Sequence, residues 1–239
     1  MNLRIEDLKV KIFADGADLR EMVEMSEKSY ISGLTTNPTL MRKAGVLNYR
    51  KFARDVLAEI QSKPISFEVF SDDLIEMRNQ ALEIASWGDN VYVKIPITNT
   101  LGLSTSEIVY ELTAAGVKVN ITAIMTLNQV EEIVASLNSK IPSYISVFAG
   151  RIADTGRDPL PTLKKSLEIL QQNSSVELIW ASPRELLNII QADEINCHVI
   201  TATKDILAKL KLLGHDLEAY SLDTVKMFRN DALSSAFSI

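Results

Sequence analysis

The chain has 239 residues, a formal net charge of −6 and a single cysteine. It offers no basic field for nucleic acid or anionic lipid, and no apolar run approaches the roughly 20 residues that cross a bilayer. The lone Cys197 excludes a disulfide framework, and the N-terminus lacks the basic-then-apolar layout of a signal peptide. We therefore expect a cytoplasmic protein whose anionic partners are small molecules.

Eight runs rich in β-branched and aromatic residues alternate with stretches of helical spacing. The predicted strands are 11–15, 33–37, 65–70, 91–97, 118–124, 144–150, 177–182 and 197–203. The predicted helices are 17–30, 47–62, 72–86, 103–115, 126–138, 159–172, 183–192 and 204–213. Strict alternation over eight repeats predicts an α/β fold, the closed parallel (β/α)8 or TIM barrel, as one domain over residues 1–239.

A further helical segment, about 218–236, follows the eighth helix of the predicted barrel. Its apolar residues need a partner, so we expect the helix to cover the bottom of the barrel or to dock on a neighbouring subunit. We expect a homo-oligomer, either a pentamer or a decamer.

The strand 91–97 carries a lysine in a run that is otherwise apolar enough to be buried. Lys94 shares one face with Tyr92 and Pro96, because alternate side chains of a strand point to opposite sides. Burial disfavours the ammonium form and so frees the lone pair that attacks a carbonyl, which is the chemistry of a Schiff-base lysine. The alternative is a lysine at a strand end that extends to solvent.

Polar residues also occur on the faces of other strands that we assign to the barrel interior, near the carboxyl ends where barrel active sites are built. These interior positions are Asp15, Asn37, Glu68, Lys94, Asn120, Thr122, Ser146 and Ser182. The same phase puts Phe148 beside Ser146, and Trp180 beside Ser182. Singly, Asn37 could be a turn residue, Thr122 a strand former and Asp15 a helix cap, but together these positions predict a polar pocket.

Three motifs carry a resemblance to a known family. They are Thr-Thr-Asn-Pro at 35–38, Val-Lys-Ile-Pro-Ile-Thr at 93–98 and Ile-Ser-Val-Phe-Ala-Gly-Arg-Ile at 145–152. From about residue 11 to the C-terminus, the chain resembles the transaldolase family, and within it the short subgroup that includes fructose-6-phosphate aldolases. The resemblance implies a barrel with a Schiff-base lysine on the fourth strand. We expect no metal or other cofactor, because neither histidine, His198 or His215, has a second Cys or His at zinc-ligand spacing.

The resemblance also implies roles for individual residues. Lys94 would form the Schiff base, Asp15 would be the acid/base at the hydroxyl where the C–C bond breaks, and Glu68 would act through a water held with Thr122. Arg151 and Arg184, after the sixth and seventh strands, are placed to bind a phosphate, although either could be an ordinary surface ion pair. The residues expected to bind substrate are Asn37, Thr36, Asn120, Ser146, Phe148, Ser182, Arg151 and Arg184.

Two positions separate the hypotheses for the reaction. Related aldolases carry Gln and Tyr where this chain has Glu68 and Phe148, so this pair favours a transaldolase that moves a dihydroxyacetone unit from a ketose phosphate to an aldose phosphate. The alternatives are a fructose-6-phosphate aldolase-type lyase and a non-catalytic barrel that binds sugar phosphates. The chain departs from the family pattern around the pocket mouth, at Gly16, 98–102 and 182–184, so the resemblance predicts a reaction class and not the individual sugars.

Overall fold

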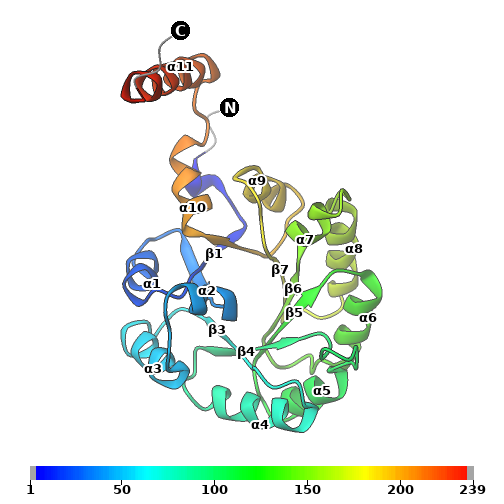
Figure 1. Ribbon diagram of the computed structural model, residues 1–239. Helices are drawn as coiled ribbons and strands as arrows, with labels where there is room; N and C mark the ends of the chain where they lie inside the picture. The colour runs from blue at the N-terminus through cyan, green and yellow to red at the C-terminus, as the bar shows by residue number, and fades with distance from the viewer. Residues whose placement is uncertain (1–3, 236–239) are drawn as a thin grey trace.

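The computed structural model describes residues 4–235 and contains a closed barrel of parallel strands (Figure 1). The strands are β1 (Lys11–Asp15), β2 (Ile31–Thr35), β3 (Ile65–Glu68), β4 (Val91–Pro96), β5 (Val119–Ile124), β6 (Ser143–Val147), β7 (Val176–Trp180) and β8 (Val199–Thr203). They are paired in chain order, and β8 closes the barrel on β1. The predicted (β/α)8 barrel is confirmed.

Helices form a ring outside the strands (Figure 1). The helices that follow predicted segments are α1 (Leu19–Ser26), α3 (Tyr49–Glu59), α4 (Leu74–Ala85), α5 (Ser106–Ala114), α6 (Leu127–Ser136), α8 (Leu160–Leu170), α9 (Leu187–Glu194) and α10 (Lys204–Leu207), which η2 (Ala208–Leu212) continues. A short turn of helix, η1 (Ile5–Asp7), precedes β1. These helices, apart from η1, cover the outer face of the barrel, which leaves the carboxyl ends of the strands to form a site.

Two short helices that the sequence did not predict lie directly after strands. Helix α2 (Pro38–Lys43) begins where the Asn37 side chain accepts a hydrogen bond from the backbone N–H of Leu40, with a proline at the first helical position. Helix α7 (Ala149–Asp154) begins after Phe148, so the sixth strand is shorter than predicted. Each has only six residues, too few for a helical period to stand out from the adjacent strand.

A small hydrophobic cluster fills the inside of the barrel, separate from the main core between strands and helices. Its buried members are Phe13, Tyr144, Ile179, Ala181 and Val199, with Tyr92 and Phe148 packed against them. The rings of Phe13 and Tyr144 meet edge to face at 5.6 Å. Gly33 makes room for this packing, because a Cβ there would lie 2.5 Å from the Phe13 ring. The cluster forms a floor one step below the polar side chains at the carboxyl ends.

The predicted phase of β7 was wrong. Trp180 belongs to the outer core and is fully buried there, whereas Ile179 and Ala181 face the barrel interior. Ser182 therefore does not reach the pocket by strand alternation. It lies beyond the end of β7 in a left-handed conformation, with φ of 59°, and this turn brings it to the pocket wall. A left-handed backbone at a serine is not readable from an alternation pattern.

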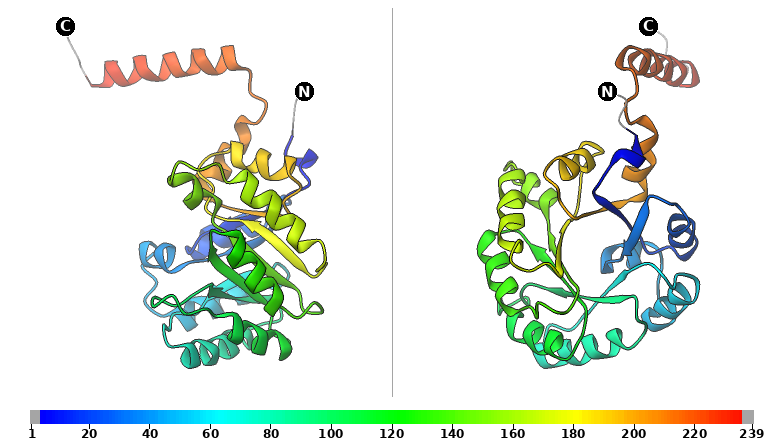
Figure 2. Two further views of the ribbon diagram at one scale, coloured as in Figure 1. Left: turned by 90° about the vertical axis from the view of Figure 1, so that its right-hand side faces the viewer. Right: turned by 180° about the vertical axis from the view of Figure 1, so that it is seen from behind.

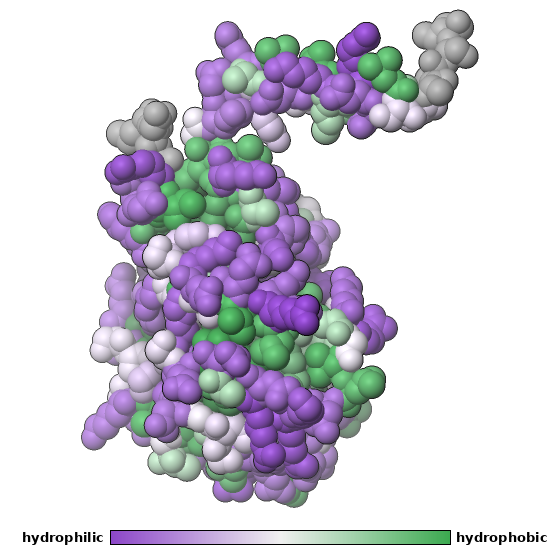
Figure 3. Space-filling view, turned by 90° about the vertical axis from the view of Figure 1, so that its left-hand side faces the viewer, coloured by the Kyte–Doolittle hydropathy of each residue, from purple (hydrophilic) through white to green (hydrophobic). Residues whose placement is uncertain are grey.

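Helix α11 (Leu217–Ser234) extends away from the barrel and does not cover its bottom (Figure 2). None of its residues is buried, and apolar side chains lie exposed along it, including Leu222, Val225 and Phe228 (Figure 3). Of the two predicted locations, the barrel bottom is therefore wrong, and docking on a neighbouring subunit stays a prediction. Position 236, the predicted end of this helix, lies outside the described residues. No helix within residues 4–235 is long and apolar enough to cross a membrane.

Candidate active site

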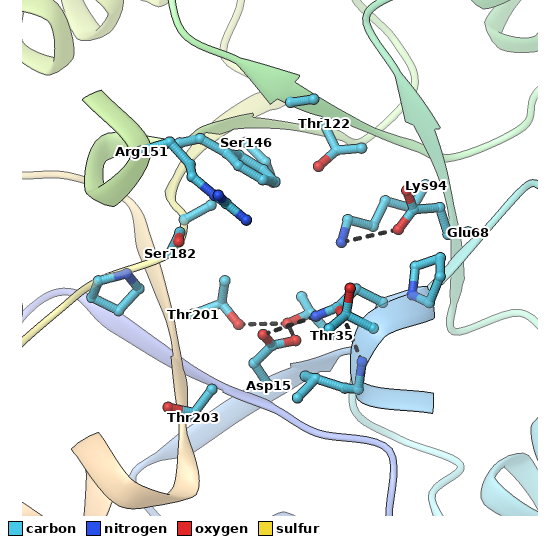
Figure 4. A pocket seen from close by; sticks show the side chains of 18 of the residues that line it. Asp15, Thr35, Glu68, Lys94, Thr122, Ser146, Arg151, Ser182, Thr201 and Thr203 are labelled. Carbon is cyan, nitrogen blue, oxygen red and sulfur yellow. Dashed lines mark hydrogen bonds and ion pairs between the residues drawn. The ribbon is translucent and has the colours of Figure 1, made fainter. Parts of the chain in front are cut away.

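A pocket of about 540 Å³ opens at the carboxyl ends of the strands, above the hydrophobic floor. Side chains from opposite sides of the barrel face one another across it (Figure 4). The predicted residues that line it are Asp15, Asn37, Glu68, Lys94, Thr122, Ser146, Phe148, Arg151, Ser182 and Arg184. The structure therefore brings most of the predicted site together, and Thr36 and Asn120 are the exceptions.

Lys94 occupies the middle of the buried wall of this pocket. Lys94 is only 7% exposed, so the alternative of a lysine that extends to solvent is wrong. The amine donates a hydrogen bond to the backbone carbonyl of Thr36 at 3.0 Å and lies 3.3 Å from a carboxylate oxygen of Glu68. Strands β3 and β4 pair in register at Glu68 and Lys94, which fixes this contact. The amine is thus held in place while still facing the cavity.

Glu68 is a buried carboxyl group whose pKa is raised above its ordinary value. Burial is the main cause; the positive charge of Lys94 opposes the shift, and the negative charge of Asp15 adds to it. A carboxyl group with a raised pKa can hold a proton closer to neutral pH, which suits an acid/base catalyst. Thr122, on β5, lines the same pocket as Glu68.

The hydroxyl of Thr122 is buried and has no hydrogen-bond partner within residues 4–235. Its strand is irregular at this point, because the pairing of β5 with β6 shifts between Ile121 and Ile124 and Ala123 has φ of 63°. Such a bulge re-aims the side chains beside it. An unpaired buried hydroxyl costs free energy, so Thr122 points to a water or ligand in the pocket.

Asp15 is the second carboxyl group of the pocket, and it is not a helix cap, since Asp18 caps α1. Burial raises its pKa, against the charge of Lys94 and hydrogen bonds from Thr35 and Asn37. The Thr35 hydroxyl donates to Oδ1 at 2.8 Å, and the Asn37 amide donates to Oδ2 at 3.3 Å. Asn37 therefore both caps α2 through its oxygen and faces Asp15 through its nitrogen.

Four threonines that line the pocket were not predicted as site residues, namely Thr35, Thr39, Thr201 and Thr203, and two of them connect to Asp15. Thr35 bonds Asp15, and its hydroxyl lies 2.5 Å from the hydroxyl of Thr201 on β8. The signals were present, because Thr35 begins the Thr-Thr-Asn-Pro motif and Thr201 alternates with Thr203 at a strand end. Threonine is also a common strand former, so the residue type alone does not separate a site hydroxyl from a packing residue.

Thr36 and Asn120 lie behind the pocket wall and do not line it. The Thr36 hydroxyl donates to the carbonyl of Ser66, while its own carbonyl receives the Lys94 amine. The Asn120 amide donates to the Ser66 hydroxyl at 2.9 Å, and its oxygen accepts from the Ser146 hydroxyl at 2.7 Å. Both side chains are completely buried. Thr36 therefore holds Lys94 and Asn120 holds Ser146 through hydrogen bonds, and neither side chain faces the cavity where a molecule would bind.

The opposite wall of the pocket carries the two arginines. Arg151 points into the cavity beside Ser182 (Figure 4), and its side chain makes no ion pair within residues 4–235. Arg184 is held by Asp154 of α7 through two hydrogen bonds, one of them from Nε at 3.0 Å. A guanidinium has five N–H donors, so three of them stay available. The alternative of an ordinary ion pair is thus met by one edge of Arg184, which binds Asp154, and it is not met by Arg151 within residues 4–235.

A close backbone contact joins the two segments that carry these arginines. A Cβ on Gly150 would lie 1.6 Å from the carbonyl oxygen of Ser182, so only glycine permits this approach. Helix α7 and the loop after β7 therefore form one unit at the pocket mouth. Within residues 4–235, no group of three or more His, Cys, Asp or Glu side chains could hold a metal ion.

The chain is similar to known proteins over most of its length. Residues 12–238 match the family model described as transaldolase/fructose-6-phosphate aldolase. The chain is 32% identical over 209 residues to a "Probable transaldolase" of Dehalococcoides mccartyi, covering 87% of this chain and 92% of that protein. It is 35% identical over 206 residues to "Probable transaldolase 2" of Listeria monocytogenes, covering 84% and 88%.

Solved structures share the fold at lower sequence identity. The structure of a candidate fructose-1,6-biphosphate aldolase from Coccidioides immitis superposes with a TM-score of 0.55 at 13% identity, covering 87% of this chain and 82% of that one. At this identity the match supports the barrel fold alone. The family model, in contrast, spans nearly the whole chain, including each motif that resembled the family. The chain therefore belongs to the transaldolase/fructose-6-phosphate aldolase family.

Proposed function

We propose that this protein is a transaldolase that transfers a dihydroxyacetone unit from a ketose phosphate to an aldose phosphate through a Schiff base on Lys94. One observation carries the proposal. A buried amine faces a cavity with one carboxyl group, Glu68, 3.3 Å away and a second, Asp15, close enough for the lysine charge to act on its pKa. Family membership adds the reaction class.

The first step is formation of the Schiff base. The neutral Lys94 amine attacks the C2 carbonyl of the ketose phosphate, and the resulting carbinolamine must lose its hydroxyl as water. Glu68 supplies the proton for that departure through a water that the free Thr122 hydroxyl helps to hold. The product is an iminium ion, which can accept electrons from the neighbouring C–C bond.

The second step breaks the C3–C4 bond. Asp15 removes the proton from the C4 hydroxyl, the C4 oxygen becomes an aldehyde carbonyl, and the electron pair of the C3–C4 bond moves into the iminium to give an enamine. The aldose phosphate leaves. The three-carbon unit stays bound until the enamine carbon attacks an acceptor aldehyde and Asp15 returns its proton to the new hydroxyl. Water then hydrolyses the new iminium, which breaks the bond to Lys94 and releases the product ketose phosphate.

Substrate binding divides between two parts of the pocket. Asn37 and Ser146 are placed to hold the hydroxyls of the three-carbon unit, while Thr36 and Asn120 hold the groups behind them. We assign the phosphate to Arg151, with Ser182 and the free edge of Arg184 beside it, since fixed cationic donors bind phosphate well. Phe148 supplies no hydroxyl at the reacting centre, which favours transfer over protonation of the enamine and release.

We also propose that residues 1–239 act as one domain, in the cytoplasm, within a homo-oligomer of five or ten subunits. The exposed apolar residues of α11 support the homo-oligomer, because an apolar surface of this kind is rarely left to solvent. Deletion of residues 217–239, or the double substitution Leu222→Glu with Phe228→Glu, should lower the native mass measured by light scattering. An unchanged mass in both variants would remove α11 from the interface.

The experiment that tests the proposed reaction measures product formation from fructose 6-phosphate with and without an acceptor aldose phosphate. A transaldolase forms the new ketose phosphate quickly and releases little free dihydroxyacetone when the acceptor is absent. Equal dihydroxyacetone release under both conditions would indicate the aldolase-type lyase. No conversion of any ketose phosphate, by a protein that still binds these sugars, would indicate a non-catalytic barrel.

A further inference from the structure

A chain of two buried hydroxyls runs from β8 through β2 to Asp15 (Figure 4). The Thr35 hydroxyl donates to Asp15 Oδ1 at 2.8 Å, and the Thr201 hydroxyl lies 2.5 Å from that of Thr35. The residue exposures are 2% for Thr35 and 7% for Thr201, so water does not replace these bonds freely. The proposed reaction so far uses neither threonine.

The number of protons fixes the direction of the chain. A hydroxyl has one proton to donate, and that of Thr35 goes to the ionised Asp15. The short contact between the threonines must then use the Thr201 proton, with the Thr35 oxygen as acceptor. The order is Thr201 to Thr35 to Asp15 Oδ1, and it holds as long as Asp15 is an acceptor at that oxygen.

The two oxygens of Asp15 are therefore not equivalent. A proton placed on Oδ1 would make that oxygen a poorer acceptor and would favour reversal of two buried hydroxyls. A proton placed on Oδ2 leaves the chain intact and disturbs only the longer contact from the Asn37 amide at 3.3 Å. The structure favours Oδ2 as the oxygen that changes its proton during the reaction.

Resting on the proposed transaldolase reaction, we infer that Thr35 and Thr201 are positioning residues that hold Asp15 through Oδ1, so that Oδ2 takes and returns the proton of the C4 hydroxyl. A carboxylate that rotates freely would present either oxygen and would lose the orientation that catalysis needs. The chain also stabilises the ionised form, which is the form that acts as a base.

The charged groups around Asp15 influence its pKa, and the pH dependence of the cleavage rate reflects that pKa. Lys94 on β4 favours the ionised form of Asp15, and Glu68 on β3 is an acidic residue of the same pocket. Three further charged residues line the mouth of the same pocket, namely Arg151, Arg184 and Asp205. Because these groups stay in place when a threonine is changed, a shift of the profile can be assigned to the lost hydrogen bond.

The test uses single-turnover kinetics that separate Schiff-base formation from C–C cleavage. In Thr35→Val, the pH below which the cleavage rate falls, its acid limb, should increase by about one unit. The reason is that the ionised form of Asp15 loses a hydrogen bond, which raises the pKa of this carboxyl group. Schiff-base formation, which uses Glu68, should keep its pH dependence. Thr35→Ser retains the hydroxyl and should restore the wild-type limb.

Thr201→Val should move the same limb in the same direction by less, since Thr201 acts through Thr35. The double variant should shift no further than Thr35→Val alone. Thr113→Val is the control for the limb, because Thr113 is a fully buried threonine of α5 that does not line the pocket and donates to the carbonyl of Val109. Fully additive shifts, or an equal shift in Thr113→Val, would overturn the chain.

Failure of this inference is distinguishable from failure of the proposed function. If wild-type protein forms no borohydride-trapped adduct with a ketose phosphate, the proposed function fails. If the adduct forms normally and the cleavage limb of Thr35→Val stays at the wild-type pH, the positioning role fails. Should Thr35→Val unfold, the comparison of Thr201→Val with Thr201→Ser decides, since only the valine should shift the limb.

Discussion

The two walls of the pocket are built in different ways. On one wall Lys94, Glu68 and Asp15 project from strands, the side chains of Lys94 and Glu68 are 8% and 16% exposed, and the register of β3 with β4 sets the contact between these two. On the other wall Arg151 and Arg184 come from a six-residue helix and a loop, and the side chain of Arg184 is 45% exposed. Buried charges interact strongly, and exposed ones are screened by solvent. The proposed function accordingly assigns the chemistry to the first wall and the recognition of the substrate anion to the second.

The largest effect is expected from a substitution of Lys94 on the first wall, the buried wall formed with Glu68 and Asp15. Lys94→Met should abolish turnover, because Lys94 supplies the one side-chain amine among the described residues that line the pocket, and covalent catalysis is lost entirely without it. Circular dichroism and thermal unfolding should show a folded barrel. Lys118→Met, at the opposite end of a neighbouring strand, is the matched control and should keep its activity. Residual turnover in Lys94→Met above that of a buffer blank would assign the Schiff base elsewhere.

Substitutions on the second wall, the exposed wall with Arg151 and Arg184, should weaken substrate binding and leave the chemical step unchanged. Arg151→Ala should raise KM for a phosphorylated donor by roughly 10- to 100-fold, as expected for loss of a charge-assisted hydrogen bond. Its effect on an unphosphorylated analogue should be small. Asp154→Asn should give a weaker version of the same change, because it frees Arg184 from its holder without removing the charge.

Steady-state kinetics with both substrates measure that difference. Equal losses on phosphorylated and unphosphorylated donors would make Arg151 a structural residue and would leave the contrast between the walls without support.

Sequence alone predicted the fold almost completely, and it predicted the two walls unequally. Strand alternation brought Asp15, Glu68 and Lys94 together because a period of two is maintained inside a strand. It failed at Ser182, where the chain leaves β7 in a left-handed conformation. It also could not reveal that Asn120 faces protein partners on both sides, since burial depth depends on neighbouring strands and not on the residue's own strand.

Phe148 lies between the walls, at the end of β6, and sharpens the distinction between transfer and release. Phe148→Tyr adds a hydroxyl that can order water and pass a proton to the enamine. The ratio of free dihydroxyacetone to transferred product should rise several-fold. A buried hydroxyl without a partner costs about 1 to 3 kcal/mol, so some loss of stability is expected as well. An unchanged ratio in a folded variant would place Phe148 away from the reacting carbon.

The smallest expected effect is on stability. The pKa of Asp15 is raised in the folded protein, so this state binds the proton more tightly than the unfolded chain does. Its contribution to the free energy of unfolding is present at low pH and falls as pH rises from the ordinary carboxyl pKa through the folded one. Asp15→Asn, which cannot ionise, should therefore raise Tm at pH 7 by about 2 to 4 °C and should give little gain near pH 3.

Calorimetry at the two pH values checks this difference. A Tm that falls at pH 7 and not at pH 3 would mean that the hydrogen bonds from Thr35 and Asn37 outweigh the cost of burying the Asp15 charge.

The most direct test of the lysine chemistry is borohydride reduction in the presence of ketose phosphates, followed by peptide mass mapping. We predict a reduced three-carbon adduct on the peptide that contains Lys94 with at least one donor, and no adduct in Lys94→Met. An adduct on another lysine, or none with any ketose phosphate while the protein remains folded, would contradict the assignment of the buried wall as the catalytic one.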